Sequence, residues 1–465
     1  MRAEFSETGV ELFQNGQRIR HPTAFGQLEP GMGAADTFTR LREQANLDTH
    51  ALEPPGPNPY AAPYMDTNQE PPRPPLVLVP PLAQHSGSDD EAALALSAER
   101  LRTTDGVGGA MREGLLRWTI VLAIAAFGTL LLGHVEGAVL MAMAGMYALA
   151  QSWDVRDRAR TGDPLADTSL EPGGIGSVLR FIVPLLAPVA GTVLYASLAV
   201  YSRMLPPNAA SIAALQWCSA SALVCLLAAL PPIQRQLALV FTRGPYPGHT
   251  ARLTSALALV ILLLPVPAQL LLPRVTELLS QTGKPLVDIG GLVGQLIGEV
   301  LFALAAVGLW VGRDARATLA RLGLGGMTVR HWIIAIVGLA VVVGLNAGLE
   351  WVERTQYHEL WLRDQAMVKL IAADLSLAAL LVLGVSAGVG EEVLVRGALQ
   401  PRVGLVWASL LFAAGHVQYT WFGMLTIALL GVTLGLVRKH ANTTTAIMVH
   451  ALYDIIAAFG ARSGG

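Results

Sequence analysis

Long apolar runs, separated by short polar stretches, fill most of the chain after residue 113. An α-helix needs about 20 predominantly apolar residues to cross the hydrocarbon core of a bilayer, and these runs approach or reach that length. The pattern therefore predicts an all-α, polytopic transmembrane helix bundle. Its spans, about eleven in number, are expected at residues 115–132, 135–152, 178–201, 209–230, 253–272, 287–311, 333–349, 371–389, 403–417, 422–437 and 443–459.

The first 113 residues are different, because polar residues and proline dominate them. Proline is dense between Pro54 and Pro81, where it interrupts helices and strand ladders alike. Within this part, Asn15-Gly16 stands between two short alternating segments, a pattern that predicts a β-hairpin with a two-residue turn. We therefore expect residues 1–113 to form an extramembrane, largely disordered, Pro-rich tail.

Basic side chains gather in every second loop between the predicted spans. The loops after the second, fourth, sixth, eighth and tenth spans carry Arg or Lys, whereas the others are poor in basic residues or, at 350–364, net acidic. Cytoplasmic loops carry this excess in membrane proteins. We expect an integral, multi-pass protein of the bacterial plasma membrane, with its N-terminus in the cytoplasm and its C-terminus outside.

Composition agrees with a membrane protein. Hydrophobic residues make up 53% of the chain and charged residues 14%, whereas a soluble globular domain carries about 25% charged residues. The net charge of −2 provides no basic surface for a nucleic acid. We therefore expect the lipid bilayer, and no nucleic acid, as a partner.

Two adjacent carboxylates, Glu391 and Glu392, stand at the end of a membrane-length apolar run. Each ionisable group in hydrocarbon costs on the order of 3 kcal/mol, so such residues are candidates for function. On a helix Glu392 lies one turn before Arg396, which suits an ion pair, and Glu391 points about 100° away. One carboxylate can thus be held structurally while the other stays free for chemistry, although a helix end meeting water would also explain the charges.

Two histidines lie inside later apolar runs. His416 follows Phe412 in the run at 403–417, and His450 lies in the run at 443–459. Asp454 is one turn after His450 and shares its helix face, where a carboxylate can fix the tautomer and orientation of the ring. A single histidine on an apolar helix is usually a buried core residue, but two of them close to the acidic pair favour a shared site.

The order Glu-Glu-x-x-x-Arg, Phe-x-x-x-His and His-x-x-x-Asp resembles the CAAX prenyl endopeptidase and bacteriocin-processing family of intramembrane proteases, also called the CAAX protease self-immunity family. The resemblance covers residues 371–459, and Asp454 stands where some members carry Asn. It implies an endopeptidase that cleaves a membrane-associated or prenylated-type peptide, so the expected partner is a peptide or protein substrate in the membrane. It also implies that Glu391 activates the attacking water, that Glu392 and Arg396 support the site, and that His416 and His450 complete it.

The part that a metal would play stays open at this point. Two histidines and a carboxylate, here Glu391, His416 and His450, could hold a catalytic zinc with an open fourth position. The same groups could act without a metal, with Glu391 taking a proton from water and a histidine stabilising the oxyanion. We prefer the metal-free mechanism. No cofactor is certain from the sequence, and zinc is possible.

Three other functions compete with this interpretation. Gly384-Val385-Ser386-Ala387-Gly388 matches the Gly-x-Ser-x-Gly motif, so Ser386 with a histidine would make a serine-type protease. That motif needs a strand before the serine and a helix after it, whereas this one lies in a helical run. An ion-coupled transporter would also bury charges, but it should show paired broken helices in two similar halves. A catalytically inactive scaffold or immunity protein would keep the same residues.

The sixth run contains a further polar residue among small ones. Gly290, Gly294 and Gly298 are spaced four apart, which allows two helices to approach closely. Glu299 follows them and is expected either to line a substrate path or to hydrogen-bond a neighbouring helix.

We divide the chain into the tail at 1–113, transmembrane helices of unassigned role at 114–350, and the protease-like domain at 351–465.

Overall fold

The computed structural model describes residues 2–6, 9–14, 17–18, 106–131, 134–161, 175–243, 248–271, 287–372 and 375–463. The chain falls into two compact units, Met1–Leu78 and Val79–Gly465. Each unit is described by itself.

The first unit contains a small antiparallel sheet. Its strands β1 (Arg2–Ser6), β2 (Gly9–Gln14) and β3 (Gln17–Arg18) pair in sequence order. Gln14 lies opposite Gln17 in the β2–β3 pair, which confirms the hairpin predicted around Asn15-Gly16. Strand β1 adds a partner that the sequence pattern did not predict. The predicted Pro-rich linker lies outside the described residues.

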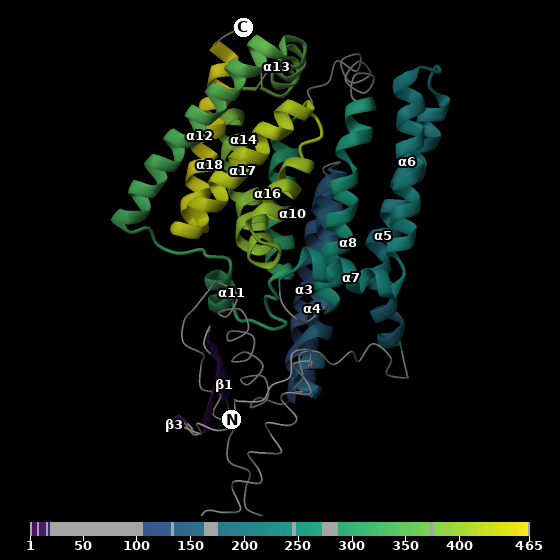
Figure 1. Cartoon of the computed structure of the whole chain (residues 1–465), viewed down its shortest axis with the longest axis vertical. Coiled ribbons are helices and arrows are strands. Elements are labelled where there is room, and N and C mark those ends of the chain that lie inside the picture. Colours follow the sequence, from purple (N-terminus) through teal and green to yellow (C-terminus); the bar gives the residue numbers. More distant parts are fainter. Residues whose placement is uncertain are drawn as a thin grey trace, which may run out of the picture. The chain divides into compact units, whose positions relative to one another are not determined.

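The described part of the second unit consists of helices. Those of its first half are α3 (Gly106–Leu131), α4 (Val135–Thr161), α5 (Ile175–Met204), α6 (Ala209–Ala228), α7 (Pro231–Phe241), α8 (His249–Leu263) and α10 (Ile289–Ala306). Those of its second half are α11 (Ala315–Arg321), α12 (Val329–Gln356), α13 (His358–Ala372), α14 (Leu377–Glu391), the π-helix η2 (Glu392–Leu399), α15 (Gln400–Val403), α16 (Leu405–Ala414), α17 (Trp421–His440) and α18 (Thr443–Ser463). The long helices run roughly side by side (Figure 1).

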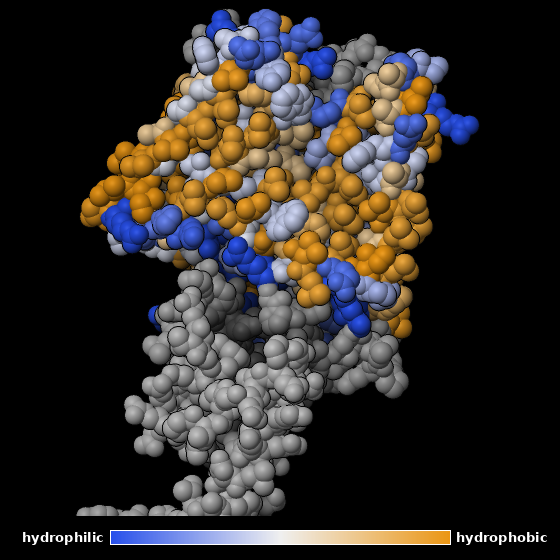
Figure 2. All heavy atoms as spheres, in the orientation of Figure 1, coloured by the Kyte–Doolittle hydropathy of each residue, from blue (hydrophilic) through white to orange (hydrophobic). Residues whose placement is uncertain are grey.

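In the described part of the chain, nine helices are long and apolar enough to cross a membrane. They fall on nine of the eleven predicted runs, so the all-α, polytopic bundle is confirmed. The run at 135–152 lies on α4, which is not among the nine; the later turns of α4 carry buried polar side chains, including Gln151, Asp154 and Asp157. The run at 403–417 is interrupted after the ten residues of α16. Figure 2 shows hydrophobic residues over the middle of the helical body and hydrophilic residues toward its two ends.

Close contact between α14 and α18 places Glu391, at the end of α14, beside His450 of α18. Gly384 and Gly388 lie one turn apart on the face of α14 that meets α18. A Cβ atom on Gly388 would lie 2.7 Å from the backbone nitrogen of Ala451, and one on Gly384 would lie 2.6 Å from Ile455 Cγ1. Only glycine fits at these two positions without a shift, so the two helices meet at a distance that longer side chains would prevent.

Helix α10 packs in a similar way against α4, as its glycine spacing predicted. A Cβ on Gly298 would lie 2.9 Å from Leu140 Cβ, and one on Gly137 would lie 3.1 Å from the carbonyl oxygen of Gly294. Helix α10 also contacts α14 and η2. The unassigned first half of the helical unit therefore reaches the segment that carries Glu391 and Glu392.

Candidate functional site

The two adjacent carboxylates stand where the backbone changes from α-helix to π-helix. Glu391 is the last residue of α14 and Glu392 the first residue of η2, which continues to Leu399. A π-helical turn holds an extra residue compared with an α-helical one, and such turns occur often at functional sites. The change of helix type alters the directions in which the side chains around Glu391 project, which the sequence pattern did not predict.

Glu392 and Arg396 form an ion pair that is closed off from solvent. Both side chains are 0% exposed, and Arg396 Nε lies 3.3 Å from Glu392 Oε2. The guanidinium carbon of Arg396 lies 4.7 Å from the centroid of the Phe412 ring, a cation–π contact. Glu392 Oε1 accepts a hydrogen bond of 3.0 Å from His450 Nδ1. Through these contacts the pair connects η2 to Phe412 of α16 and to His450 of α18.

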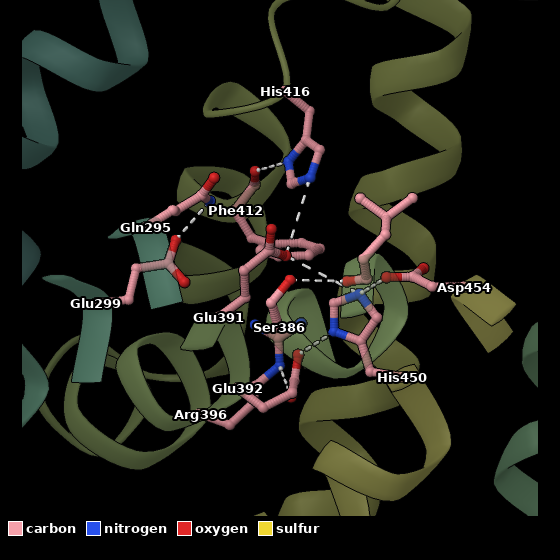
Figure 3. Close-up of polar contacts among 11 residues, drawn as sticks. Gln295, Glu299, Ser386, Glu391, Glu392, Arg396, Phe412, His416, His450 and Asp454 are labelled. Carbon is pink, nitrogen blue, oxygen red and sulfur yellow. Dashed lines mark hydrogen bonds and ion pairs between the residues drawn. The ribbon is translucent and has the colours of Figure 1, made fainter. Parts of the chain in front are cut away.

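Glu391 faces the two histidines. Its Oε2 atom lies 4.0 Å from His416 Nε2 and 3.9 Å from His450 Nε2. The Glu391 side chain is 18% exposed, whereas that of Glu392 is fully buried. Figure 3 shows the three side chains converging from separate elements. The predicted division, with one carboxylate held in the structure and its neighbour free, matches this geometry.

Each histidine is fixed through its Nδ1 atom. His416 Nδ1 lies 2.8 Å from the backbone oxygen of Phe412, which can only accept, so this nitrogen carries the hydrogen. His450 Nδ1 faces the carboxylate of Glu392 in the same way. The Phe412 ring packs edge-on against both imidazoles, with ring centroids 4.7 Å and 5.9 Å away. These contacts leave both Nε2 atoms directed toward Glu391.

Asp454 reaches His450, as its spacing predicted. Asp454 Oδ2 lies 3.4 Å from His450 Nε2, the nitrogen that also faces Glu391. Glu392, rather than Asp454, holds the opposite nitrogen. The orientation of the ring is therefore set from both sides, by a carboxylate on η2 and by another on α18 itself.

A cavity of about 850 Å³ adjoins these groups. Glu391, His416, His450 and Asp454 line it, whereas Glu392, which was expected to share the site, is not among its lining residues. Much of the remaining wall is apolar and comes from α10, α12, α14, α16 and α17: Leu292, Leu296, Val342, Leu383, Phe412, Ile427, Leu430 and Leu434. The lining also contains polar side chains beyond the four acids and histidines, among them Asn346, Glu353, Asp364 and Gln365.

Ser386 also lines the cavity, but its surroundings differ from those of a serine nucleophile. It lies inside α14, not on a turn between a strand and a helix. Its hydroxyl donates a 3.0 Å hydrogen bond to the backbone oxygen of Leu383 on the same helix. The local fold thus lacks the elbow that the Gly-x-Ser-x-Gly motif needs.

Among the described residues, no group of three or more His, Cys, Asp or Glu side chains is placed to hold a metal ion. This includes the three ligands that the sequence proposed for zinc, Glu391, His416 and His450.

Glu299 on α10 is a further acid beside this site (Figure 3). It is 7% exposed and accepts a 2.9 Å hydrogen bond from Gln295 Nε2. Gln295 belongs to α10 itself, so the predicted hydrogen bond to a neighbouring helix is not the one found. Gln295 lines the cavity.

Residues 373–456 match the family model of the Rce1-like type II CAAX prenyl endopeptidases. The uncharacterized protein YpbD of Bacillus subtilis (strain 168) is 28% identical over 160 residues, which make up 34% of this chain and 82% of that relative. No solved structure matches the chain. The segment that resembles the Rce1-like type II CAAX prenyl endopeptidases contains all six residues that the sequence singled out.

Proposed function

We propose that the chain is an intramembrane endopeptidase of the CAAX-protease type, which hydrolyses a membrane-associated or prenylated-type peptide with a water molecule activated by Glu391. The observation that carries the proposal is the placement of two histidine Nε2 atoms within 4.0 Å of one Glu391 oxygen, at the wall of a cavity between membrane helices. The family of residues 373–456 supports protease chemistry of this type.

Glu391 is the general base in this mechanism. The distances from its Oε2 atom to the two imidazoles exceed those of direct hydrogen bonds, and a water molecule bridges polar groups at such separations. His416, whose Nδ1 hydrogen is held by a backbone oxygen, offers Nε2 as the acceptor that orients this water. Glu391 takes a proton from the water, and the water oxygen attacks the carbonyl carbon of the scissile peptide bond.

His450 stabilises the tetrahedral intermediate. In this step His450 is an imidazolium: its Nδ1–H donates to Glu392, and its Nε2–H donates a hydrogen bond to the oxyanion that forms on the carbonyl oxygen. Asp454, beside the same nitrogen, limits the rotation of the ring. The proton accepted by Glu391 then passes to the nitrogen of the leaving fragment, and the carbon–nitrogen bond breaks. Water is consumed, and a carboxylate and an amine are the products.

The two sides of the cavity suit a substrate with an apolar anchor. Leucine, isoleucine and valine side chains make up part of the lining, beside polar side chains that include Glu391 and the two histidines. Burial of an apolar chain contributes about 0.8 kcal/mol per CH₂ group, so a lipid-like or hydrophobic segment can hold the peptide near the catalytic groups. We take this as support for a prenylated or membrane-embedded peptide.

We also propose that the N-terminus is cytoplasmic and that the protein lies in the plasma membrane. The loops predicted to be cytoplasmic contact one another: Arg243 N donates to the Arg402 oxygen at 2.6 Å, and Arg321 Nη1 donates to the Gly397 oxygen at 2.9 Å. Their common position at one end supports a single, basic cytoplasmic face.

Purified protein in liposomes, supplied with a quenched fluorescent peptide that carries a farnesylated C-terminal Cys-a-a-X sequence, tests the chemistry. Glu391→Ala and His416→Ala are expected to abolish cleavage while the protein stays folded and membrane-inserted. Ser386→Ala is the matched control from the same cavity and should keep its activity. Loss of activity in the Ser386 variant alone, or labelling of Ser386 by a serine-directed probe, would instead establish the serine-type mechanism.

A further inference from the structure

The cavity beside Glu391 extends away from the basic loops, which follow the second, fourth, sixth, eighth and tenth predicted spans. Helices α12 and α18 begin among these loops, and their lining residues come later, from Val342 and from His450 onward. Helices α10 and α17 end among the loops, and their lining residues stop at Leu296 and Leu434. Along α14 and η2, the described lining ends at Glu391. The cavity thus occupies the part of the bundle that lies away from the basic loops.

Hydrogen bonds hold several basic loops together at the opposite end. The Thr443 nitrogen donates to the Gly323 oxygen at 3.0 Å, which joins the start of α18 to the loop before α12. Arg402 Nη2 donates to the Ala306 oxygen at 2.9 Å, which joins α15 to the end of α10. The loops after the sixth, eighth and tenth spans therefore form one end of the helical body.

A layer of buried side chains separates Glu391 from that end. Glu392 and Arg396, on the turns that follow, are both 0% exposed. Leu322, also 0% exposed, packs against the same segment, because a Cβ atom on Gly397 would lie 3.1 Å from Leu322 Cδ2. Protein interiors packed in this way hold few voids larger than a water molecule. The layer therefore closes the cavity on the side of the basic loops.

The other end of the cavity, at α13, is polar. Its lining there includes Glu350 and Arg354, both exposed on α12, together with Gln365 on α13 and Gln418 just before α17. Figure 1 places α13 at this end of the helical body, and Figure 2 shows hydrophilic residues there. Polar and charged side chains at membrane depth face a bundle interior or a water-filled cavity. This end therefore suits the entry of water and of a peptide.

We propose that water and substrate reach Glu391 from the end of the bundle that carries α13, on the non-cytoplasmic side, so that the enzyme cleaves the non-cytoplasmic part of a membrane-associated peptide. Basic loops mark the cytoplasmic face, and the cavity leads away from them. A peptide bond presented from the cytoplasm would meet the layer formed by Glu392, Arg396 and Leu322 instead. The cleavage rests on the proposed function and the side on the proposed orientation, whereas the path itself depends on neither.

Cysteine labelling in right-side-out membrane vesicles tests the path without any need for cleavage. Cys218 and Cys225 are replaced by Ala, and one cysteine is then introduced in each protein. Asn346→Cys lies in the cavity lining on α12, whereas Val341→Cys is its matched control, exposed on the same helix but outside the lining. Arg316→Cys marks the basic end, because Arg316 is exposed on α11.

A charged, membrane-impermeant methanethiosulfonate reacts with the thiolate, which forms in water and is suppressed in apolar surroundings. With reagent outside, Asn346→Cys should react on the order of tenfold faster than Val341→Cys, because only the former faces the polar cavity. Arg316→Cys should react only when the reagent is admitted to the vesicle interior. Prior reaction from outside should also stop cleavage of the farnesylated peptide by the Asn346→Cys protein.

Reaction of Asn346→Cys and Arg316→Cys from the same side would overturn the path, as would no reaction of Asn346→Cys from either side. Gln418→Cys carries the same expectation as Asn346→Cys if that variant does not fold. Reaction of Asn346→Cys from the interior and of Arg316→Cys from outside would overturn the non-cytoplasmic assignment. A wild type that cleaves no peptide would count against the proposed function and not against the labelling pattern.

Discussion

Replacing Arg396 with Met is expected to lower the free energy of unfolding by about 3–5 kcal/mol, the usual cost of removing one partner of a buried ion pair. Both Arg396 and Glu392 are 0% exposed, so water cannot replace the guanidinium, and the carboxylate keeps only its contact with His450. The change also removes the cation–π contact with Phe412. The double variant Glu392→Gln/Arg396→Met leaves no uncompensated charge, and it should therefore cost less than the sum of the two single changes by about 0.5–3 kcal/mol.

Denaturant titration in mixed micelles, followed by tryptophan fluorescence, measures these free energies. Arg316→Met serves as the control, because Arg316 is exposed on α11 and exposed substitutions usually change stability by less than about 0.5 kcal/mol. A loss for Arg396→Met no larger than that of the control would refute the reasoning. So would strict additivity of the two single changes, because it would mean that the two side chains do not stabilise each other.

Three further changes test separate parts of the structure. Asp454→Asn should keep part of the peptidase activity and Asp454→Ala less, because the amide still limits rotation of the neighbouring imidazole; equal wild-type activity would show that the carboxylate only packs. Gly388→Ala should cost about 1–3 kcal/mol through contact with Ala451, whereas Gly344→Ala, with open space around it, should not destabilise the protein. Burial raises the pKa of Asp364 above its usual 3.8, so the folded state binds that proton more tightly, and the resulting stability is full below pH 3.8 and lost as the pH rises through the raised pKa. Thermal unfolding of Asp364→Asn across that range should therefore depend less on pH than that of the wild type, and an equal dependence would contradict this cause.

Residue types and spacing predicted most of the bundle and the residues that meet in the cavity. Apolar runs of membrane length specify helices, because in lipid every backbone polar group must be satisfied within the helix. The cost of ionisable groups in lipid correctly indicated that Glu391, His416 and His450 would face one another. The i, i+4 spacing likewise predicted the contacts of Glu392 with Arg396 and of His450 with Asp454.

Other features depend on contacts between segments far apart in the sequence. No pattern in the sequence predicts the change to a π-helix at Glu392. In the structure, η2 packs against α10 and α18, which are distant in the sequence. For the same reason spacing alone assigned the orientation of His450 to Asp454, and the role of Glu392 at Nδ1 became visible only when α18 was placed beside η2. The Gly-x-x-x-Gly spacing before Glu299 indicated close helix packing, but which helix it meets could not be predicted from one chain's pattern.

The most direct test of the central claim compares the wild type with Glu391→Gln on one farnesylated peptide in liposomes, with both products identified by mass spectrometry. Glu391→Gln keeps the shape of the side chain and removes its ability to take a proton. The account predicts cleavage at a single peptide bond by the wild type and none by the variant, although both bind the peptide. Equal cleavage by the two proteins would show that Glu391 is not the base that activates water.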